Sequence, residues 1–176
     1  MPASRASRSA PDLAVIIVSW NVRDLLLEAL RSLLADLEAS HLRARVLVVD
    51  SASGDGSAGA VRAAFPQVEL FAESENVGFV RGNNLALRAL GLDQPDAGLG
   101  GPRAVYLLNP DTITQPGATR ALFDALFNEP RVGLVGANLT YEDGSFQHGA
   151  FAFPGLRQLW AEFFPTPGRL IEGRFN

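Results

Sequence analysis

Short apolar runs alternate with longer amphipathic stretches along most of this chain. Four of the apolar runs have the length of a strand, and the first two are continuous, as in strands that are buried on both faces. They occupy residues 13–18, 46–49, 68–72 and 104–108. Four other stretches repeat apolar positions at helical spacing. They occupy residues 25–37, 57–65, 79–90 and 116–127. This alternation predicts an α/β fold, a mostly parallel sheet with helices on both faces.

Further signals refine this pattern. Asn21 precedes the first helical stretch and is a residue type that caps helices. The charged residues of that stretch, Asp36 among them, are expected largely on its polar side. Residues 132–137 form another apolar run and predict a fifth strand, and Asp143-Gly144 predicts a hairpin turn just beyond it.

The composition excludes several classes of protein and of chemistry. Of the 176 residues 47% are apolar and 19% are charged, which is the composition of a folded domain. A net charge of −4 gives no electrostatic reason to expect nucleic-acid binding. The absence of cysteine excludes disulfides and thiol catalysis. No apolar run is long enough to span a membrane, and the first eleven residues do not resemble a secretory signal, so we expect a cytoplasmic protein.

Polar residues follow each of the four predicted strands. In parallel sheets ligands bind beyond the carboxyl ends of the strands, so we expect these residues to lie close together. They are Ser19-Trp20-Asn21, Asp50-Ser51, the segment 73–78 and Asn109-Pro110-Asp111. Each also has a purely local interpretation. Asp50 and Asn76 would then form turns, Asp111 would cap the next segment, and Trp20 would be a core aromatic.

One motif competes with this interpretation. Residues 54–59 satisfy the G-x-G-x-x-G pattern of dinucleotide-binding domains, after a strand and before a helix. Four residues separate the strand from the first glycine, and Asp50 and Asp55 would place negative charge where a pyrophosphate should lie. We therefore keep a dinucleotide-binding Rossmann-like domain only as a minor alternative.

Five sequence blocks together resemble family 2 glycosyltransferases of the GT-A fold, and are closest to their rhamnosyltransferase-like branch. The blocks are VIIVSWN (15–21), VLVVDSASGDGS (46–57), ENVGFVRGNN (75–84), YLLNPDT (106–112) and VGLVGANL (132–139) followed by DGSFQ (143–147). The resemblance implies a GT-A nucleotide-sugar-binding domain over residues 13–153. We expect residues 1–12 to be a disordered leader. Residues 154–176 would begin an acceptor-side region that is C-terminally incomplete.

The resemblance implies roles for particular residues. Asp50 would accept a hydrogen bond from the imide N–H of uracil or thymine, since a carboxylate can only accept. Ser19, Trp20 and Asn21 would line the base and ribose. The nucleoside and diphosphate would be bordered by Asn76, Gly78, Arg81, Asn83 and Asn84, with help from N–H groups at the start of a helix.

The segment Asn109-Pro110-Asp111 stands where the family has its D-x-D motif. Asp111 would bind Mg²⁺ or Mn²⁺, cations that prefer oxygen ligands, and the metal would bridge the diphosphate. Asn109 replaces the first carboxylate, which would weaken metal affinity. The reaction implied is inverting transfer of a sugar from a UDP- or dTDP-sugar to a hydroxyl of a glycan or lipid-linked acceptor.

No residue is assigned as the general base that such a reaction needs. Glu142 lies in the predicted hairpin turn, and Glu162 has no motif around it. A lipid-linked acceptor would bring the protein to the inner face of a membrane. The aromatic residues Trp160, Phe163 and Phe164 would then touch that membrane or pack against a part of the protein outside this chain. A non-catalytic nucleotide-sugar-binding module stays open as the main alternative.

Overall fold

The structure is a computed structural model that describes residues 10–93, 100–147 and 149. The chain divides into two compact units, Met1–Asn128 and Glu129–Asn176, which are described separately below. The predicted leader apart from residues 10–12, and the whole of residues 154–176 with Trp160, Glu162, Phe163 and Phe164, lie outside the described residues. Within the described part of the chain, no helix is long and apolar enough to cross a bilayer.

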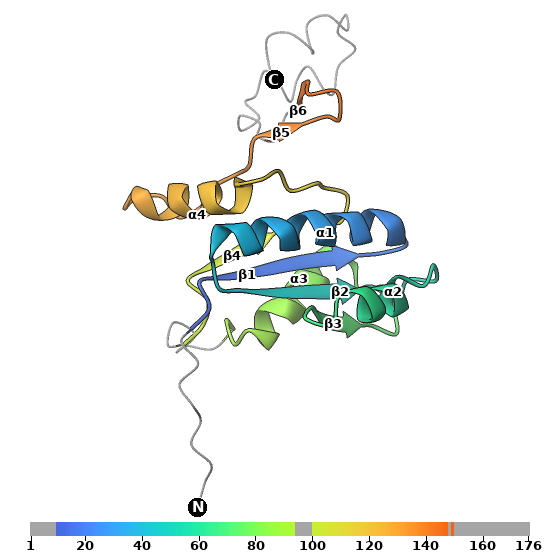
Figure 1. The fold of residues 1–176 in the computed structure, drawn as a ribbon. Helices are drawn as coiled ribbons and strands as arrows, with labels where there is room; N and C mark the ends of the chain where they lie inside the picture. The colour runs from blue at the N-terminus through green and yellow to red at the C-terminus, as the bar shows by residue number, and fades with distance from the viewer. Residues whose placement is uncertain (1–9, 94–99, 148, 150–176) are drawn as a thin grey trace, which may run out of the picture. The chain divides into compact units, whose positions relative to one another are not determined.

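Strands and helices alternate through the first unit, as the sequence predicts (Figure 1). In chain order the elements are β1 (Leu13–Ser19), α1 (Arg23–Ser40), β2 (Ala44–Asp50), α2 (Ser57–Ala64), β3 (Glu69–Ala72), α3 (Gly78–Ala89), β4 (Ala104–Leu107) and α4 (Ala118–Asn128). The last helix begins two residues after Pro116, where the sequence pattern placed its start.

The four strands form one parallel sheet in the order β3-β2-β1-β4. In this register Leu13 pairs with Ala44 and Ser19 pairs with Asp50, so β1 and β2 end together. Asp50 also pairs with Ala72 at the end of β3. The predicted parallel sheet is therefore confirmed, and the carboxyl ends of its first three strands lie at one edge.

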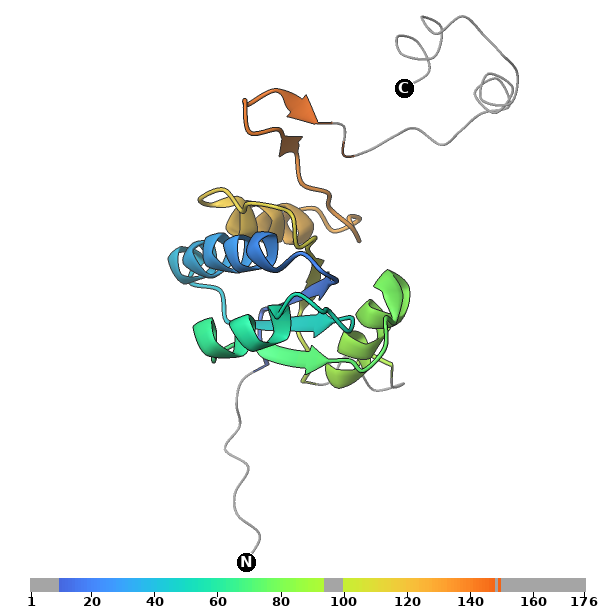
Figure 2. The same cartoon turned by 90° about the vertical axis from the view of Figure 1, so that its right-hand side faces the viewer.

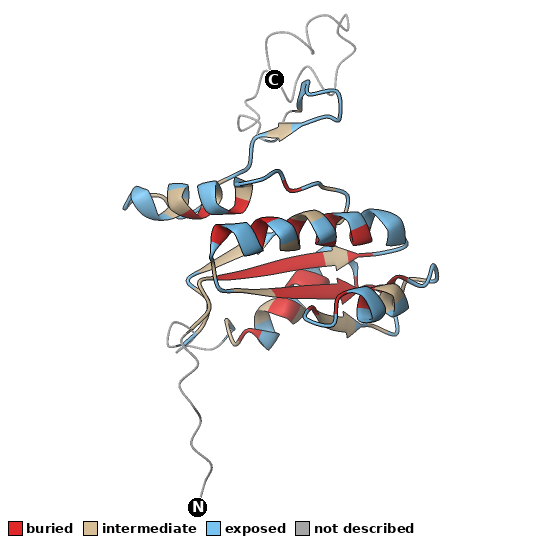
Figure 3. Cartoon of the chain, in the orientation of Figure 1, coloured by how far each residue is buried: buried red, intermediate tan, exposed pale blue. Residues whose placement is uncertain are grey.

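Helices cover both faces of the sheet (Figures 1 and 2). Ile17 of β1 packs in a core with Leu30 of α1 and Val61 of α2. Ile16, the preceding residue, points to the other face and packs in a second core with Ala86 of α3. Burial is concentrated in β1 and β2, the two central strands (Figure 3). Two buried faces explain why these strands are continuously apolar.

Helix α3 lies unusually close to the sheet at Gly82. A Cβ atom added to Gly82 would lie 2.8 and 2.9 Å from the two Cγ atoms of Val18 on β1. Such distances are shorter than ordinary van der Waals contact. The missing side chain therefore lets the α3 backbone approach β1, and this fixes the position of the polar residues on α3.

The prediction that Asp36 lies on the polar side of α1 is wrong. Asp36 is only 4% exposed, because the buried face of α1 includes it together with Leu33, Leu37 and Ser40. Its carboxylate accepts hydrogen bonds from the N–H groups of Gly117 and Thr119 at the start of α4. The charge is thus compensated by the unpaired amides at a helix N-terminus.

The second unit contains the predicted hairpin, formed by β5 (Leu139–Thr140) and β6 (Phe146–Gln147). The Asp143 carboxylate accepts a hydrogen bond from the Ser145 N–H (2.8 Å) in the connecting turn. The predicted strand at residues 132–137 is wrong. A strand needs a partner for its backbone groups, and no described residue forms a ladder with this segment; accordingly Leu134 is 87% exposed.

Candidate functional site

The carboxyl ends of β1, β2 and β3 bring together the first group of polar residues, as predicted. Beyond the last ladder pair, the Ser51 N–H donates to the Ser19 carbonyl (2.8 Å), and the Glu73 N–H donates to the Asp50 carbonyl (2.9 Å). Ser19, Asp50, Ser51 and Glu73 therefore share one rim of the sheet. We call this set the rim.

Asp50 is a buried carboxylate of the rim. It is 3% exposed, and its Oδ2 atom accepts a hydrogen bond from the Ser53 N–H (3.1 Å). Its Oδ1 atom and the Ser19 Oγ atom are buried without a hydrogen-bond partner among the described residues. An unsatisfied buried polar atom costs about 1–3 kcal/mol. One carboxylate oxygen thus serves the local turn, while the other is left without a partner among the described residues.

The loops after β1 and β2 are joined by three hydrogen bonds around Asn21, which has a φ of 53°. The Asn21 N–H donates to Ser53 Oγ (2.9 Å), and the Gly54 N–H donates to Asn21 Oδ1 (2.8 Å). The Arg23 N–H donates to Asp55 Oδ2 (2.8 Å). The predicted capping role of Asn21 is therefore wrong: its side chain is turned to Gly54, and Asp55 caps α1 from the neighbouring loop.

Asp55 also holds the start of α2. Its Oδ1 atom accepts hydrogen bonds from the N–H (3.0 Å) and the hydroxyl of Ser57, and the hydroxyl bond is the main cause of the lowered pKa of Asp55. The glycine-rich segment 54–59 thus uses its polar groups to connect two helices. It does not present them to a pyrophosphate, so the dinucleotide-binding interpretation does not fit.

Ser51 links the rim to the start of α3, a role that the sequence interpretation missed. It is 1% exposed, accepts hydrogen bonds from the N–H groups of Val77 (2.8 Å) and Gly78 (3.2 Å), and donates to Asn76 Oδ1 (2.9 Å). Asn76 Oδ1 also accepts a bond from the Gly78 N–H (2.9 Å). Gly78 has a φ of 69°, which favours glycine. Asn76 and these two amides therefore hold the loop in place.

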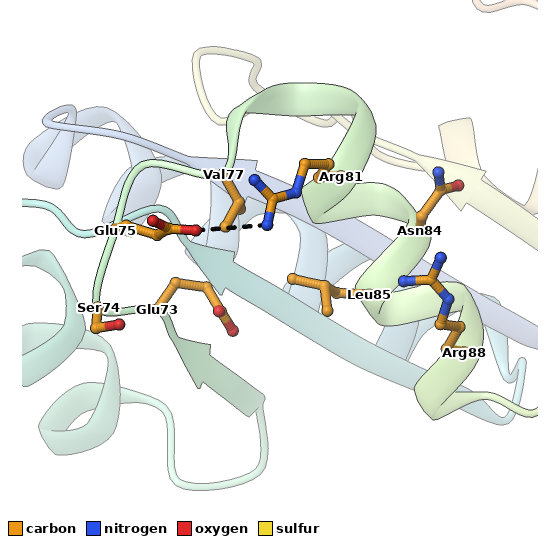
Figure 4. Close-up of a pocket in the computed structure, with 8 residues that line it drawn as sticks. All are labelled: Glu73, Ser74, Glu75, Val77, Arg81, Asn84, Leu85 and Arg88. Carbon is orange, nitrogen blue, oxygen red and sulfur yellow. Dashed lines mark hydrogen bonds and ion pairs between the residues drawn. The ribbon is translucent and has the colours of Figure 1, made fainter.

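The three candidate residues of α3 other than Gly78 separate into two groups. Asn83 is buried, and its side-chain amide donates to the Phe79 carbonyl one turn earlier (2.9 Å). Arg81 and Asn84 instead line a pocket of about 250 Å³. Its other lining residues are Glu73, Ser74, Glu75, Val77, Leu85 and Arg88 (Figure 4). An exposed ion pair joins Arg81 to Glu75 at 3.4 Å (Figure 4).

The segment Asn109-Pro110-Asp111 follows β4 at the same end of the sheet. Asn109 and Asp111 are exposed, and the Thr112 hydroxyl donates to the Asn109 carbonyl (2.8 Å). The alternative that Asp111 caps the next segment is wrong, because Asp36 has that role at α4. Nowhere in the described residues do three His, Cys, Asp or Glu side chains gather as a metal site. One carboxylate suffices where a diphosphate and water supply the other ligands.

The remaining candidates are exposed. Trp20 has 54% of its surface exposed, so it is not a core residue and lies free next to the rim. In the second unit, Glu142 is exposed beside Asp143, whose pKa is lowered mainly by the hydrogen bond from the Ser145 hydroxyl. Asp143 is thus occupied by the turn, and neither residue is identified as a general base.

Comparison with known proteins identifies the class of the domain. A mannosyltransferase from Pyrobaculum calidifontis, solved in complex with GDP-Man and Mn²⁺, superposes with a TM-score of 0.55 at 26% identity. The superposition covers 70% of this chain and 34% of that one. The parallel sheet with helices on both faces therefore has the GT-A fold.

The sequence model of glycosyl transferase family 2 matches residues 14–166, and the chain belongs to this family. N-acetylglucosaminyl-diphospho-decaprenol L-rhamnosyltransferase from two Mycobacterium tuberculosis strains, CDC 1551 / Oshkosh and H37Rv, is 34% identical over 114 residues. The match covers 63% of this chain and 36% of each relative. The resemblance to family 2 is thus confirmed, and the chain spans about a third of the length of these relatives.

Proposed function

We propose that this chain forms the donor-binding part of an inverting glycosyltransferase that uses a UDP- or dTDP-sugar. The observation that carries the proposal is Asp50, a buried carboxylate with one oxygen left without a partner. Uracil and thymine each carry one imide N–H group, from which such an oxygen can accept a hydrogen bond. Cytosine has an acceptor at the same ring position, so a carboxylate there would disfavour it.

The residues around Asp50 suit the rest of a nucleotide. Trp20 is exposed beside the rim and has a flat face on which a base can stack. Ser19 Oγ is buried without a partner and can donate to the base or ribose. Arg81 and Asn84 line a polar pocket on the neighbouring helix, and guanidinium groups recognise phosphate well.

Asp111 would hold a divalent cation, Mg²⁺ or Mn²⁺. It is exposed at the end of β4 and makes no hydrogen bond to another described residue, so its oxygens are available as ligands. The solved mannosyltransferase is itself a complex with Mn²⁺. When bound, such a cation stabilises the negative charge of the departing nucleoside diphosphate. Asn109 supplies a neutral oxygen where a second carboxylate would bind more strongly.

The acceptor we propose is a lipid-linked glycan. The support comes from the Mycobacterium tuberculosis relative, whose name specifies a diphospho-decaprenol compound. Such an acceptor would place the protein peripherally at the cytoplasmic face of a membrane. The second candidate function is a nucleotide-sugar-binding module without catalysis, which is favoured by the lack of an identified base among the described residues.

Calorimetric titration with UDP, dTDP, GDP and CDP, each in the presence of Mn²⁺, tests the donor class. We expect UDP or dTDP to bind and CDP to fail. Asp50→Asn should weaken binding about tenfold or more, because asparagine has a single acceptor oxygen for both the Ser53 N–H and the imide N–H. Asp24→Asn is the matched control, since it removes the same charge from an exposed position in the first turn of α1.

Two results would overturn the proposal: no nucleotide binds, or CDP or GDP binds as tightly as the better of UDP and dTDP. A sugar-transfer assay on the same chain then separates the two candidates, because only the enzyme releases UDP when an acceptor is added.

A further inference from the structure

Two polar residues of α1 face the segment that follows β4. The Thr114 N–H donates to Ser32 Oγ (3.1 Å), while the Ser32 hydroxyl donates to the Ala29 carbonyl within α1 (3.0 Å). One turn further along, the buried Asp36 carboxylate accepts hydrogen bonds from the N–H groups of Gly117 and Thr119. The backbone of this segment is therefore bound to α1 at three amides.

The same segment is bound to the sheet at its other end. The Leu108 N–H donates to the Ile16 carbonyl (3.0 Å), which continues the β1–β4 pairing by one residue. Residues 109–113 therefore span the gap between the sheet and the Ser32 contact. The hydrogen bond from the Thr112 hydroxyl to the Asn109 carbonyl further restricts the conformations of this span. Asp111 is at its midpoint.

We propose that Ser32 and Asp36 are positioning residues, which hold the Asn109–Ile113 span so that the Asp111 carboxylate points to the cation and diphosphate. The proposal rests on the metal role of Asp111 in the proposed function. A short span with both ends fixed has fewer conformations, so less entropy is lost when the cation binds.

The charge of Asp36 fits this role. No arginine forms an ion pair with it among the described residues; its carboxylate is held by backbone amides at the start of α4 instead. A neutral asparagine would turn one N–H₂ group toward those amides and lose one of the two bonds. Tyr106 lies close enough that burial and the Asp36 charge both raise the pKa of its phenol.

Ser32→Ala is the main test and Ser40→Ala is its matched control. Ser40 lies on the same helix, donates to the Leu37 carbonyl (2.7 Å) and accepts the Leu42 N–H (3.2 Å), so both variants lose the same two kinds of bond. Hydrogen exchange would follow the amides of Thr114, Gly117 and Thr119, which donate to Ser32 and Asp36. Calorimetry would give the Mn²⁺ concentration for half-maximal UDP binding.

For Ser32→Ala we expect exchange at the Thr114 amide to rise about fivefold, and the half-maximal Mn²⁺ concentration to rise by a similar factor, for one lost hydrogen bond. Ser40→Ala should change neither. In an Asp111→Ala background, Ser32→Ala should have no further effect on the Mn²⁺ dependence, because it acts through Asp111. Asp36→Asn should raise the half-maximal Mn²⁺ concentration in the same way and should raise exchange at Gly117 or Thr119, with its stability checked by denaturation.

Unchanged exchange at Thr114 in Ser32→Ala, and at Gly117 and Thr119 in Asp36→Asn, would overturn the anchoring. An equal Mn²⁺ effect with and without Asp111 would overturn its action through that carboxylate. If the unmodified chain binds no nucleotide with Mn²⁺, the proposed function fails instead, and the positioning of Asp111 for a cation fails with it. The exchange measurement still decides whether α1 holds the span.

Discussion

Replacing Gly82 by alanine measures how closely α3 packs against the sheet. The added Cβ would lie 2.8 and 2.9 Å from the Val18 Cγ atoms, so β1 or α3 must shift. Overpacking of this kind costs about 1–3 kcal/mol. Alanine also favours helix over glycine by about 1 kcal/mol in a helix interior. The two effects have opposite signs, so the variant alone does not reveal the packing cost.

Gly59→Ala supplies the missing reference. Gly59 lies within α2 and has no atom within 4 Å of an added Cβ, so its replacement should stabilise the protein by about 0.5–1 kcal/mol. Chemical denaturation of both variants gives the difference in their free energies of unfolding. We expect Gly82→Ala to be the less stable of the two by about 1–3 kcal/mol.

A further variant shows whether Val18 is the cause. Val18→Ala removes the two Cγ atoms that an alanine at position 82 would meet. The double variant should therefore recover much of the loss seen in Gly82→Ala, giving a favourable interaction energy between the two sites. If Gly82→Ala stabilises the protein as much as Gly59→Ala does, the result would contradict the close packing of α3 against β1.

Three other predictions concern the rim and the metal segment. Ser51→Ala should lower the free energy of unfolding by about 1–3 kcal/mol, because two amides lose their acceptor, whereas Ser74→Ala, at an exposed residue, should change it little. Asp55→Asn should lower stability at neutral pH. The folded-state pKa of Asp55 lies below its unfolded value of about 3.9, so its contribution is present above that value. It is lost as the pH falls through the folded-state pKa, and denaturation between pH 6 and pH 2 should show the two proteins converging. Asn109→Asp should lower the Mn²⁺ concentration needed for UDP binding in calorimetry, since a second carboxylate adds charge to the site, and an unchanged concentration would remove this segment from the metal site.

The sheet and its helices could be predicted from the sequence because their signals are local and strong. Continuous apolar runs marked β1 and β2, and helical spacing marked α1 and α3. The strand expected at residues 132–137 shows the limit of such reasoning. Its apolar pattern is that of a buried strand, but strand formation depends on a partner that the pattern does not specify.

The rim was predictable for a different reason. Parallel strands end at one edge, so the order of elements alone brought Ser19 and Asp50 together. The hydrogen bonds that connect the loops were not predictable, because they join residues more than 20 positions apart, as between Ser51 and Val77. A signal for Asp36 did exist: it is three residues after Leu33, which places it on the apolar face of α1.

The central claim is that the free oxygen of Asp50 accepts a hydrogen bond from the imide N–H of the base. Calorimetry with UDP and with its N3-methyl analogue, both in the presence of Mn²⁺, tests it most directly, because methylation replaces that donor by a methyl group and leaves the rest of the nucleotide unchanged. We predict that the unmodified chain binds UDP at least tenfold more tightly than the analogue. One hydrogen bond to a charged group changes affinity by about tenfold. Asp50→Ala should abolish this preference. Equal binding of the two compounds by the unmodified chain would contradict the claim.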